Sequence, residues 1–456
     1  MTTLWLVQVG AGGGLPSLDT PLLERLVGFL GLAVMIGIAW LLSSNRGRVN
    51  WRLVFTGLGL QAVFGFLVLK TGVGQMLFKG ANVVFMRLLG FTEDGAAFIF
   101  GNLARGNNVP IGTPGGDNPA FGPITSGETW ANVGAFFTFG VLPTIIFFSS
   151  LMSVLYYLGI MQWVVRSLAW VMQRVLGTSG AETLSATGNI FVGQTEAPLL
   201  IKPFVGSMTV SELNTVMVGG FATIAGGVMA AYVGLLSPIW PDIAGHLLTA
   251  SVMNAPAALL ISKILVPELG EPVTKGTVRI DIGSKEANVI EAAAAGAGQG
   301  MQLALNVAAM LLAFIALISM VNYGVGALGG LVGIEHLTLE RIFGWLLAPL
   351  AWLMGASWAD AGTVGSLIGV KTVLNEFVAY TQFAALGPEA LSPRSAVVAT
   401  YALLGFANFA SIAIQIGGIG GIAPERRSDL AKLGLKAMIG GNLAAFMSAS
   451  LAGMLL

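Results

Sequence analysis

The chain has 456 residues, of which 55% are hydrophobic and only 10% are charged, and its formal net charge is zero. Soluble domains carry roughly a quarter charged residues, so this composition indicates an integral membrane protein, and the continuous apolar runs favour helices over a β-barrel. The neutral balance argues against nucleic acid as a partner, and a chain with no cysteine and only two histidines excludes disulfides and nearly excludes histidine-based metal sites.

Residues 1–178 are predicted to form scaffold spans and interfacial helices. Apolar runs long enough to cross a bilayer cover residues 22–42, 51–69 and 133–158. Charged stretches that predict amphipathic interfacial helices cover residues 70–98 and 163–176. The basic loop with Arg46, Arg48 and Arg52 is expected in the cytoplasm, which places the N-terminus outside. Residues 101–130 predict an external loop rich in glycine and proline, and residues 1–21 lack the pattern of a signal peptide.

Residues 179–265 are predicted to form a first transport repeat. An apolar stretch is interrupted by the sequence GQTEAP at residues 193–198, and a helix can hardly continue through Gly193 and Pro198. Broken backbone is tolerated in lipid only where it is buried in protein or lines a wet cavity. Residues 179–208 therefore predict a re-entrant hairpin that holds a polar solute. Two spans are expected to follow, at residues 215–236 and 243–265.

The remaining chain repeats this order. Residues 266–360 predict a cytoplasmic loop at 267–299, a scaffold span at 301–323 and an interfacial helix at 339–354. Residues 361–456 predict a second repeat, with an interrupted segment at 361–382 and spans at 395–416 and 437–455. With positive loops inside, the two hairpins enter from opposite sides of the membrane. This inverted repeat is typical of secondary transporters, whose site lies at the midplane where the repeats meet.

The predicted fold class is therefore an all-α polytopic membrane protein. It has about eight transmembrane helices, two re-entrant helical hairpins in an inverted repeat, and interfacial helices. Both termini are expected in the periplasm.

Glu196 and Glu376 are the strongest functional candidates, because each stands at the centre of a short broken element at membrane depth. An ionisable group inside a span is costly and usually faces a cavity or a partner. The alternative is a structural ion pair with Lys202 or Lys371. Those lysines stand nearer the hairpin bases, where their side chains could extend to the membrane surface, so we favour a structural role for them.

Neutral polar residues flank the glutamates and could bind an uncharged ligand. Gln194, Thr195 and Asn375 offer amides and a hydroxyl, although helix capping explains them equally well. Asn408 and Ser411 share one helix face, and the alternative for them is hydrogen bonding between helices.

One amide also suits a small hard cation. Asn189, together with carbonyls near Val192 and the hydroxyl of Thr223, offers the oxygen ligands that ion-coupled carriers use at unwound helices. The chain has no HExxH, GxSxG or Walker A pattern, so we expect it not to be an enzyme. The glycine-rich run at residues 324–329 follows no strand and is interpreted as packing.

Five motifs together resemble the concentrative nucleoside transporters. They are GQTEAP at residues 193–198, SVMNAP at 251–256, VLNEFVAY at 373–380, GFANF at 405–409, and IGGIG at 416–420 followed by APERR at 423–427. These motifs are specific because they are long and occur in the expected order. The resemblance runs from about residue 151 to the C-terminus, and the N-terminal third resembles the family in layout only.

The resemblance implies a homotrimer in a bacterial inner membrane, with a scaffold and a transport domain that moves like an elevator. It implies nucleobase contacts at Gln194, Thr195, Glu196 and Val228. It implies ribose contacts at Glu376 of the second hairpin and at Asn408 and Ser411 of the next, partly unwound span, with Phe406 beside them. It implies a sodium site at Asn189, Val192, Thr223 and Ile224. Thr223 keeps the hydroxyl of the more usual serine, and Asn189 favours sodium because proton-coupled members tend to lack it.

The expected function is sodium–nucleoside symport. A carboxylate accepts the two hydroxyl hydrogens of a ribose, and no residue clamps a phosphate, so nucleosides are favoured over nucleotides. The alternative within this class is coupling to protons through Glu196 or Glu376. The alternative in a different class is a passive nucleoside channel or receptor, against which the paired broken hairpins argue.

Overall fold

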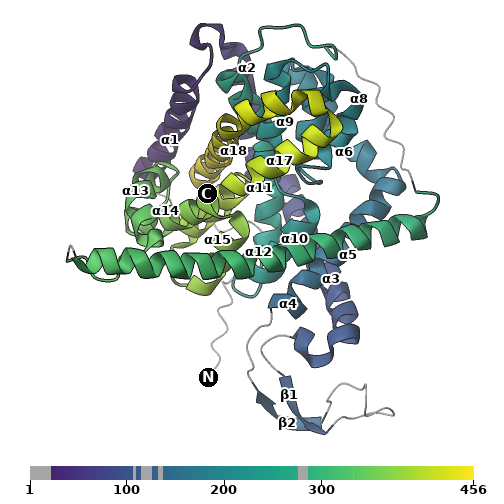
Figure 1. The fold of residues 1–456 in the computed structure, drawn as a ribbon, viewed down its shortest axis with the longest axis vertical. Coiled ribbons are helices and arrows are strands. Elements are labelled where there is room, and N and C mark those ends of the chain that lie inside the picture. The colour runs from purple at the N-terminus through teal and green to yellow at the C-terminus, as the bar shows by residue number, and fades with distance from the viewer. Residues whose placement is uncertain are drawn as a thin grey trace.

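The computed structural model describes residues 22–105, 109–113, 126–131, 137–275, 286–331 and 333–455. Almost all of these residues are helical, which confirms the predicted all-α polytopic class, and the long helix α12 (Val289–Leu331) crosses one face of a bundle of helices (Figure 1). Within these described ranges, six helices are long and apolar enough to cross a membrane, or seven if the bent pair α13–α14 counts as one span. The count of eight spans and the re-entrant path of the hairpins stay predictions.

The N-terminal third holds six α-helices. They are α1 (Leu22–Leu41), α2 (Trp51–Lys70), α3 (Gly72–Phe100), α4 (Phe137–Gly140), α5 (Leu142–Tyr157) and α6 (Ile160–Leu176), with short 3₁₀ turns η1 (Arg46–Arg48) and η2 (Gly101–Arg105). Within the expected loop at 101–130, strands β1 (Val109–Thr113) and β2 (Ser126–Ala131) pair antiparallel, away from the helical body (Figure 1). Residues 106–108 and 114–125 of that loop lie outside the described residues. Helix α6 exposes Trp163 and Trp170, as its predicted interfacial position requires.

The first repeat contains two interrupted segments followed by one long continuous helix. Its elements are α7 (Gly180–Gly188), η3 (Ala197–Ile201), α8 (Lys202–Val205), α9 (Val210–Ala222), α10 (Gly226–Leu236) and α11 (Ile243–Leu265). The predicted span at 215–236 begins earlier, at Val210, and is interrupted at residues 223–225, whereas the span at 243–265 has the predicted bounds.

The middle segment departs most from the prediction. Helix α12 already begins at Val289, so the last third of the expected cytoplasmic loop at 267–299 is helical, and residues 276–285 lie outside the described residues. Gly296 and Gly300 explain the difference, because a side chain at either would collide with α5. Ser150 Oγ also donates to Ala293 O (2.8 Å). Small residues let the helices approach closely, and this packing stabilises a helix that the local sequence pattern does not predict.

The second repeat has the same order of elements. After α13 (Leu339–Leu353) follow α14 (Trp358–Val373), α15 (Glu376–Leu386), α16 (Pro393–Leu403), α17 (Phe409–Ile422), η4 (Pro424–Arg426) and α18 (Arg427–Leu455). The predicted span at 395–416 is unwound at residues 404–408. Helices α13 and α14 meet at a bend of 116°.

Matching polar links tie each hairpin to the span that follows it. Ser179 caps α7 and donates to the Glu212 carboxylate at the start of α9 (2.5 Å). Ser392 caps α16 and donates to the Asp360 carboxylate at the start of α14 (2.6 Å). Each serine oxygen also accepts from a backbone amide that the helix start would leave unpaired, that of Glu182 in α7 and that of Ser395 in α16. The two repeats therefore share a local design as well as an order.

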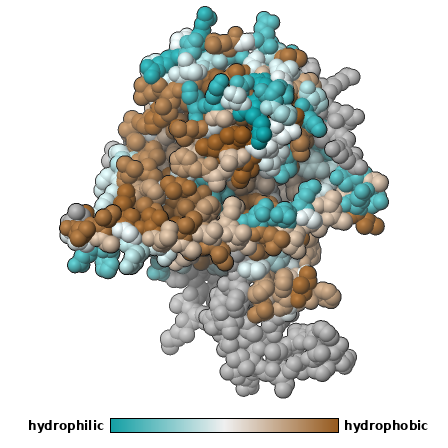
Figure 2. Space-filling view, viewed as in Figure 1, coloured by the Kyte–Doolittle hydropathy of each residue, from teal (hydrophilic) through white to brown (hydrophobic). Residues whose placement is uncertain are grey.

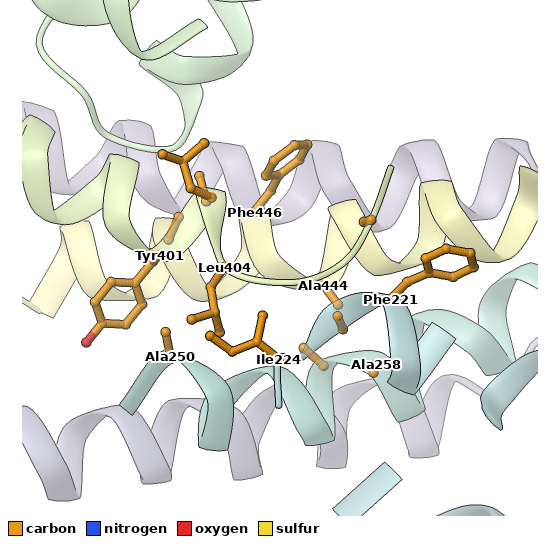
Figure 3. Packing of buried hydrophobic residues seen from close by; sticks show 14 of the residues in the cluster. Phe221, Ile224, Ala250, Ala258, Tyr401, Leu404, Ala444 and Phe446 are labelled. Carbon is orange, nitrogen blue, oxygen red and sulfur yellow. The ribbon is translucent and has the colours of Figure 1, made fainter. Parts of the chain in front are cut away.

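The apolar core lies between the two repeats, and the scaffold covers it. In α11 and α18 more than four fifths of the most apolar stretch of the helix is buried inside the protein. In α12 only 22% of the corresponding stretch is buried. Phe221, Ile224, Leu404 and Ala444 all belong to this core, and Figure 3 shows Ile224 next to Leu404. Apolar side chains also cover much of the outer surface along α12 (Figure 2). An apolar outer surface of this extent suits lipid or another protein rather than water.

Candidate functional site

Four interruptions of helical backbone surround one cavity. Its volume is about 490 Å³, within the range of roughly 300 to 1,000 Å³ typical of small-molecule sites. One wall is formed by the hairpin tips, at residues 193–196 and 375–377, and by the helix breaks at 225–228 and 406–411. The opposite wall comes from α5 and α12. The cavity therefore lies between the two repeats and the scaffold.

All eight residues predicted to bind substrate line this cavity. They are Gln194, Thr195, Glu196, Val228, Glu376, Phe406, Asn408 and Ser411. Asn375, which the sequence left between a binding and a capping role, lines it as well and also caps α15 through Val378 N (2.8 Å).

Glu376 is held firmly at the edge of the cavity. It is 4% exposed and begins α15, so the positive end of that helix faces its carboxylate. Tyr232 OH donates to Oε1 (3.0 Å), and Asn408 Nδ2 donates to Oε2 (2.9 Å). Each carboxylate oxygen accepts more than one hydrogen bond, so capacity remains for hydroxyl donors of a ligand.

The Asn408 side chain makes two hydrogen bonds with different roles. Its Oδ1 accepts from Ser411 N (2.9 Å) and caps α17, while its Nδ2 binds Glu376. The expected i, i+3 relation of Asn408 and Ser411 is therefore a helix cap rather than one face of a continuous helix. Because the cap fixes the Asn408 side chain, the amide presents a fixed orientation to the carboxylate.

The tip of the first hairpin is joined to the second repeat through amides. Gln194 Nε2 donates to Ser411 Oγ (3.2 Å), and Gln415 Nε2 donates to Gln194 Oε1 (3.0 Å). Glu196 differs from Glu376 because its side chain is exposed, with Thr195 Oγ1 donating to its Oε1 (2.9 Å). An exposed carboxylate beside a fixed amide gives this side of the cavity both donors and acceptors.

The predicted sodium ligands come from the first hairpin and from the α9–α10 break, which a hydrogen bond from Gly226 N to Phe191 O (2.9 Å) joins. Asn189 follows α7 directly and is 1% exposed, and its Oδ1 is buried without a hydrogen-bond donor in the described part of the chain. Thr223 and Ile224 occupy the break between α9 and α10, and Val192 lies in the irregular tip of the hairpin. A buried amide oxygen without a donor is costly, and oxygen ligands from unwound backbone suit a small hard cation. The donor set therefore fits sodium.

For Lys371 the expected extension of the side chain to the membrane surface is wrong, whereas the structural role favoured for it fits its contacts. Lys371 is fully buried and donates to Ala402 O (2.8 Å) and Leu404 O (3.4 Å), so its side chain does not extend to a membrane surface. Lys202 is exposed. Among the described residues, neither lysine forms an ion pair with Glu196 or Glu376.

Sequence reasoning missed Tyr232, Gln415 and the scaffold wall. Tyr232 stands one turn after Val228 on α10, and this spacing is the signal that could have revealed it. Gln415 also donates to Met217 O (3.1 Å), and it is a polar residue in an otherwise apolar helix. The scaffold wall includes Tyr156 and Gln299, whose sequence surroundings carry no motif.

Comparisons with known proteins identify the family of this chain. Three family models match the chain: "Na+ dependent nucleoside transporter N-terminus" at residues 30–103, "Nucleoside recognition" at 138–239 and "Na+ dependent nucleoside transporter C-terminus" at 246–453. An uncharacterized transporter of Haemophilus influenzae is 45% identical over 430 residues, which cover 93% of this chain and 96% of that protein. Sodium/nucleoside cotransporter 1 of Rattus norvegicus is 40% identical, with 99% of this chain and 68% of that protein covered.

Solved structures show the same architecture. The inward-facing, substrate-bound structure of CNTnw matches with a TM-score of 0.83 at 43% identity, covering 95% of this chain and 98% of that chain. Outward-facing and intermediate structures of CNTnw variants match with TM-scores of 0.82 to 0.85. With the family models and the relatives, these matches show that the chain belongs to the concentrative, Na⁺-dependent nucleoside transporter family, with sodium as the coupling ion.

Proposed function

We propose that this protein is a secondary active symporter that imports nucleosides such as uridine down a sodium gradient. The observation that carries the proposal is the cavity, at which both hairpin tips and both helix breaks converge with a glutamate on each side. A nucleoside has a polar base at one end and a ribose diol at the other. The two sides of the cavity differ in the same way.

The second repeat supplies the ribose side in this proposal. Glu376 accepts from the diol, and Asn408 with Ser411 completes the polar surface around it. A carboxylate that already has two protein donors is fixed in place, so little side-chain entropy is lost when the sugar binds. Phe406 lies beside these groups as an apolar surface.

The first repeat supplies the nucleobase side. Gln194, Thr195 and Glu196 offer an amide, a hydroxyl and an exposed carboxylate, while Val228 adds an apolar surface from α10. Glutamate accepts from a ring N–H directly or through a water, and Gln194 can donate or accept. None of these side chains is cationic, which disfavours a phosphate and so favours nucleosides over nucleotides.

Sodium binding is coupled to nucleoside binding through the first hairpin. Asn189 and Val192 belong to the hairpin, whereas Thr223 and Ile224 belong to the α9–α10 break. An ion held between them stabilises the hairpin tip against that break and so orders the base-binding residues that follow it. By linkage, sodium then raises nucleoside affinity, and the nucleoside raises sodium affinity equally.

Transport requires the loaded cavity to face each side of the membrane in turn. Because the scaffold forms only one wall, an elevator-like movement of the two repeats along α5 and α12 can carry the site across without taking it apart. We assign the scaffold to residues 1–178 and 266–360 and the moving repeats to 179–265 and 361–456. The protein is proposed to act as a homotrimer in a bacterial inner membrane, with both termini in the periplasm.

Uptake of labelled uridine into proteoliposomes tests this function. An inward sodium gradient is expected to drive uridine accumulation above the external concentration. Accumulation driven by a pH gradient alone, with no effect of sodium, would replace the proposal with proton coupling. Equilibration without accumulation under any gradient would instead indicate a passive channel.

A further inference from the structure

The two broken spans correspond to each other and meet at the centre of the protein. Helix α9 ends at Ala222 before its break, and α16 ends at Leu403 before its own. Gly405, at φ +111°, packs so closely on the first break that a Cβ there would lie 2.6 Å from Phe221 O. Figure 3 shows Ile224 and Leu404, one from each break, side by side in the core.

Each break is also held by an asparagine from the last helix of its own repeat. Asn254 on α11 donates to Ala222 O (2.6 Å), and Asn442 on α18 donates to Ala407 O (3.0 Å). The breaks are therefore equivalent in chain order and in one of their supports. Both also present the negative, carbonyl-bearing end of a half-helix to the membrane interior, where a cation is favourable.

At the first break, the proposed sodium ion would be the cation that faces this negative helix end. One proposed ligand of that sodium ion, Asn189, lies outside the break. It directly follows α7, the first arm of the first hairpin. In the second repeat the corresponding arm is α14, and its last turn carries Lys371. Lys371 Nζ donates to Ala402 O and Leu404 O, which are carbonyls at the end of α16 and the start of its break. Near the end of this arm the second repeat thus has an amine that binds its break, whereas the first repeat has an amide oxygen open to an ion.

The surroundings of Lys371 suit a cation that stays in place. Its Nζ lies 5.7 Å from the centre of the Phe446 ring, a favourable position for a cation. No carboxylate in the described part of the chain forms an ion pair with it. A fully buried lysine is expensive, so its two carbonyl contacts need a reason beyond packing. Those carbonyls lead directly into the stretch with Phe406 and Asn408, which lines the cavity.

We propose that Lys371 is a resident cation that does for the second break what sodium does for the first. It holds the end of α16 so that Phe406 and Asn408 stay turned to the nucleoside, and no ion is taken up or released there. This inference rests on the proposed sodium–nucleoside symport. It makes Lys371 a positioning residue for the ribose side and leaves the first break as the single coupling site.

Two substitutions separate a resident cation from a space-filling side chain. Lys371→Met fills the space without charge, and Lys371→Ala leaves room for an ion. Uridine binding to the purified, full-length proteins is measured against sodium chloride, with choline chloride holding the ionic strength constant. Size-exclusion chromatography and thermal melting establish that each variant is folded.

We expect both variants to bind uridine about tenfold more weakly than the wild type at low sodium, since charge-assisted hydrogen bonds are lost. In Lys371→Ala, high sodium should restore binding with a Hill coefficient rising from about 1 towards 2, while Lys371→Met should not recover. Binding by Lys371→Met at the wild-type level, or equal behaviour of both variants at every sodium concentration, would overturn the proposal.

A measurement on the wild type covers the case in which neither variant folds. The ratio of labelled sodium to labelled uridine taken up by proteoliposomes should be one, and a ratio of two would overturn the resident cation. Failure of the function itself would look different, because uridine binding by the wild type would then not depend on sodium at all.

Discussion

The two hairpin tips hold the same acidic side chain in opposite ways. Glu376 is buried, begins a regular helix and has two donors, whereas Glu196 is exposed and follows seven residues of irregular backbone, from Asn189 to Thr195. The break in the second hairpin spans only Leu374 and Asn375, and Asn375 immediately caps the next helix. The second tip is therefore built in advance, while the first is free to adjust.

This difference suggests a division of labour between the repeats. The sugar is common to all nucleosides, so a rigid carboxylate suits it. The base varies between nucleosides, and the residues that bind it must also respond to sodium binding. An adjustable hairpin tip next to the ion ligands suits both requirements. The proposals above place the coupling ion at the first break and a fixed amine at the second, and the contrast can be tested one residue at a time.

The largest effect is expected for Glu376→Gln. The substitution removes the charged acceptor for the diol. It also places an NH₂ group, itself a donor, opposite the hydrogen-bond donor of Tyr232 or of Asn408. Uridine affinity should therefore fall about 100-fold, and transport should stop. The assembled protein should remain folded. Glu389→Gln makes the same change at an exposed position of the same repeat and should leave uridine binding unchanged. Normal uridine uptake by Glu376→Gln would remove this residue from the site.

The next effect is expected for Asn189→Ala. Removal of the buried amide oxygen should raise the sodium concentration needed for half-maximal uridine binding about tenfold, with little change at saturating sodium. Thr223→Ser keeps a hydroxyl at the neighbouring break and should behave like the wild type. An unchanged sodium dependence of Asn189→Ala would remove the ion from this hairpin.

A smaller effect is expected for Glu196→Gln. Because this carboxylate is exposed to solvent, its hydrogen bonds to a base replace bonds to water, and uridine affinity should fall only about fivefold. Titration calorimetry on this variant beside Glu376→Gln measures the asymmetry directly. If both substitutions cost the same, the distinction between a prebuilt and an adjustable tip is wrong.

The smallest effect is expected for Tyr232→Phe. It removes one neutral donor from Glu376 and leaves Asn408 in place, so uridine affinity should fall about threefold. Tyr380→Phe is the matched control, because its hydroxyl donates to Thr400 O instead (2.8 Å). Equal uridine affinities of the two variants would mean that the Tyr232 contact does not support the site.

The sequence predicted the elements that a local pattern encodes. The hairpin motifs, the eight cavity residues and the bounds of α11 follow from apolar runs, polar interruptions and the family resemblance. The helix breaks at residues 223–225 and 404–408 did not, except where the resemblance implied unwinding. The chain there is largely apolar, and what opens the backbone is a tertiary contact, the packing of Gly405 on Phe221 O.

The same reason explains the other departures. The beginning of α12 looks like a loop until Gly296 and Gly300 pack against α5. Lys371 suits a membrane surface until α16 is seen to end beside it. The role of each of these positions depends on a residue that is distant in the chain but close in space. A single sequence does not show which distant residues are close in space.

The most direct test of the central claim is uridine binding to the purified protein in sodium chloride and in choline chloride at equal ionic strength. The structure-based account predicts that isothermal titration detects binding in sodium and that replacing sodium with choline weakens it by about tenfold or more. Equal uridine affinity in the two salts would contradict the account, because the ion ligands at Asn189 would then have no influence on the cavity they adjoin.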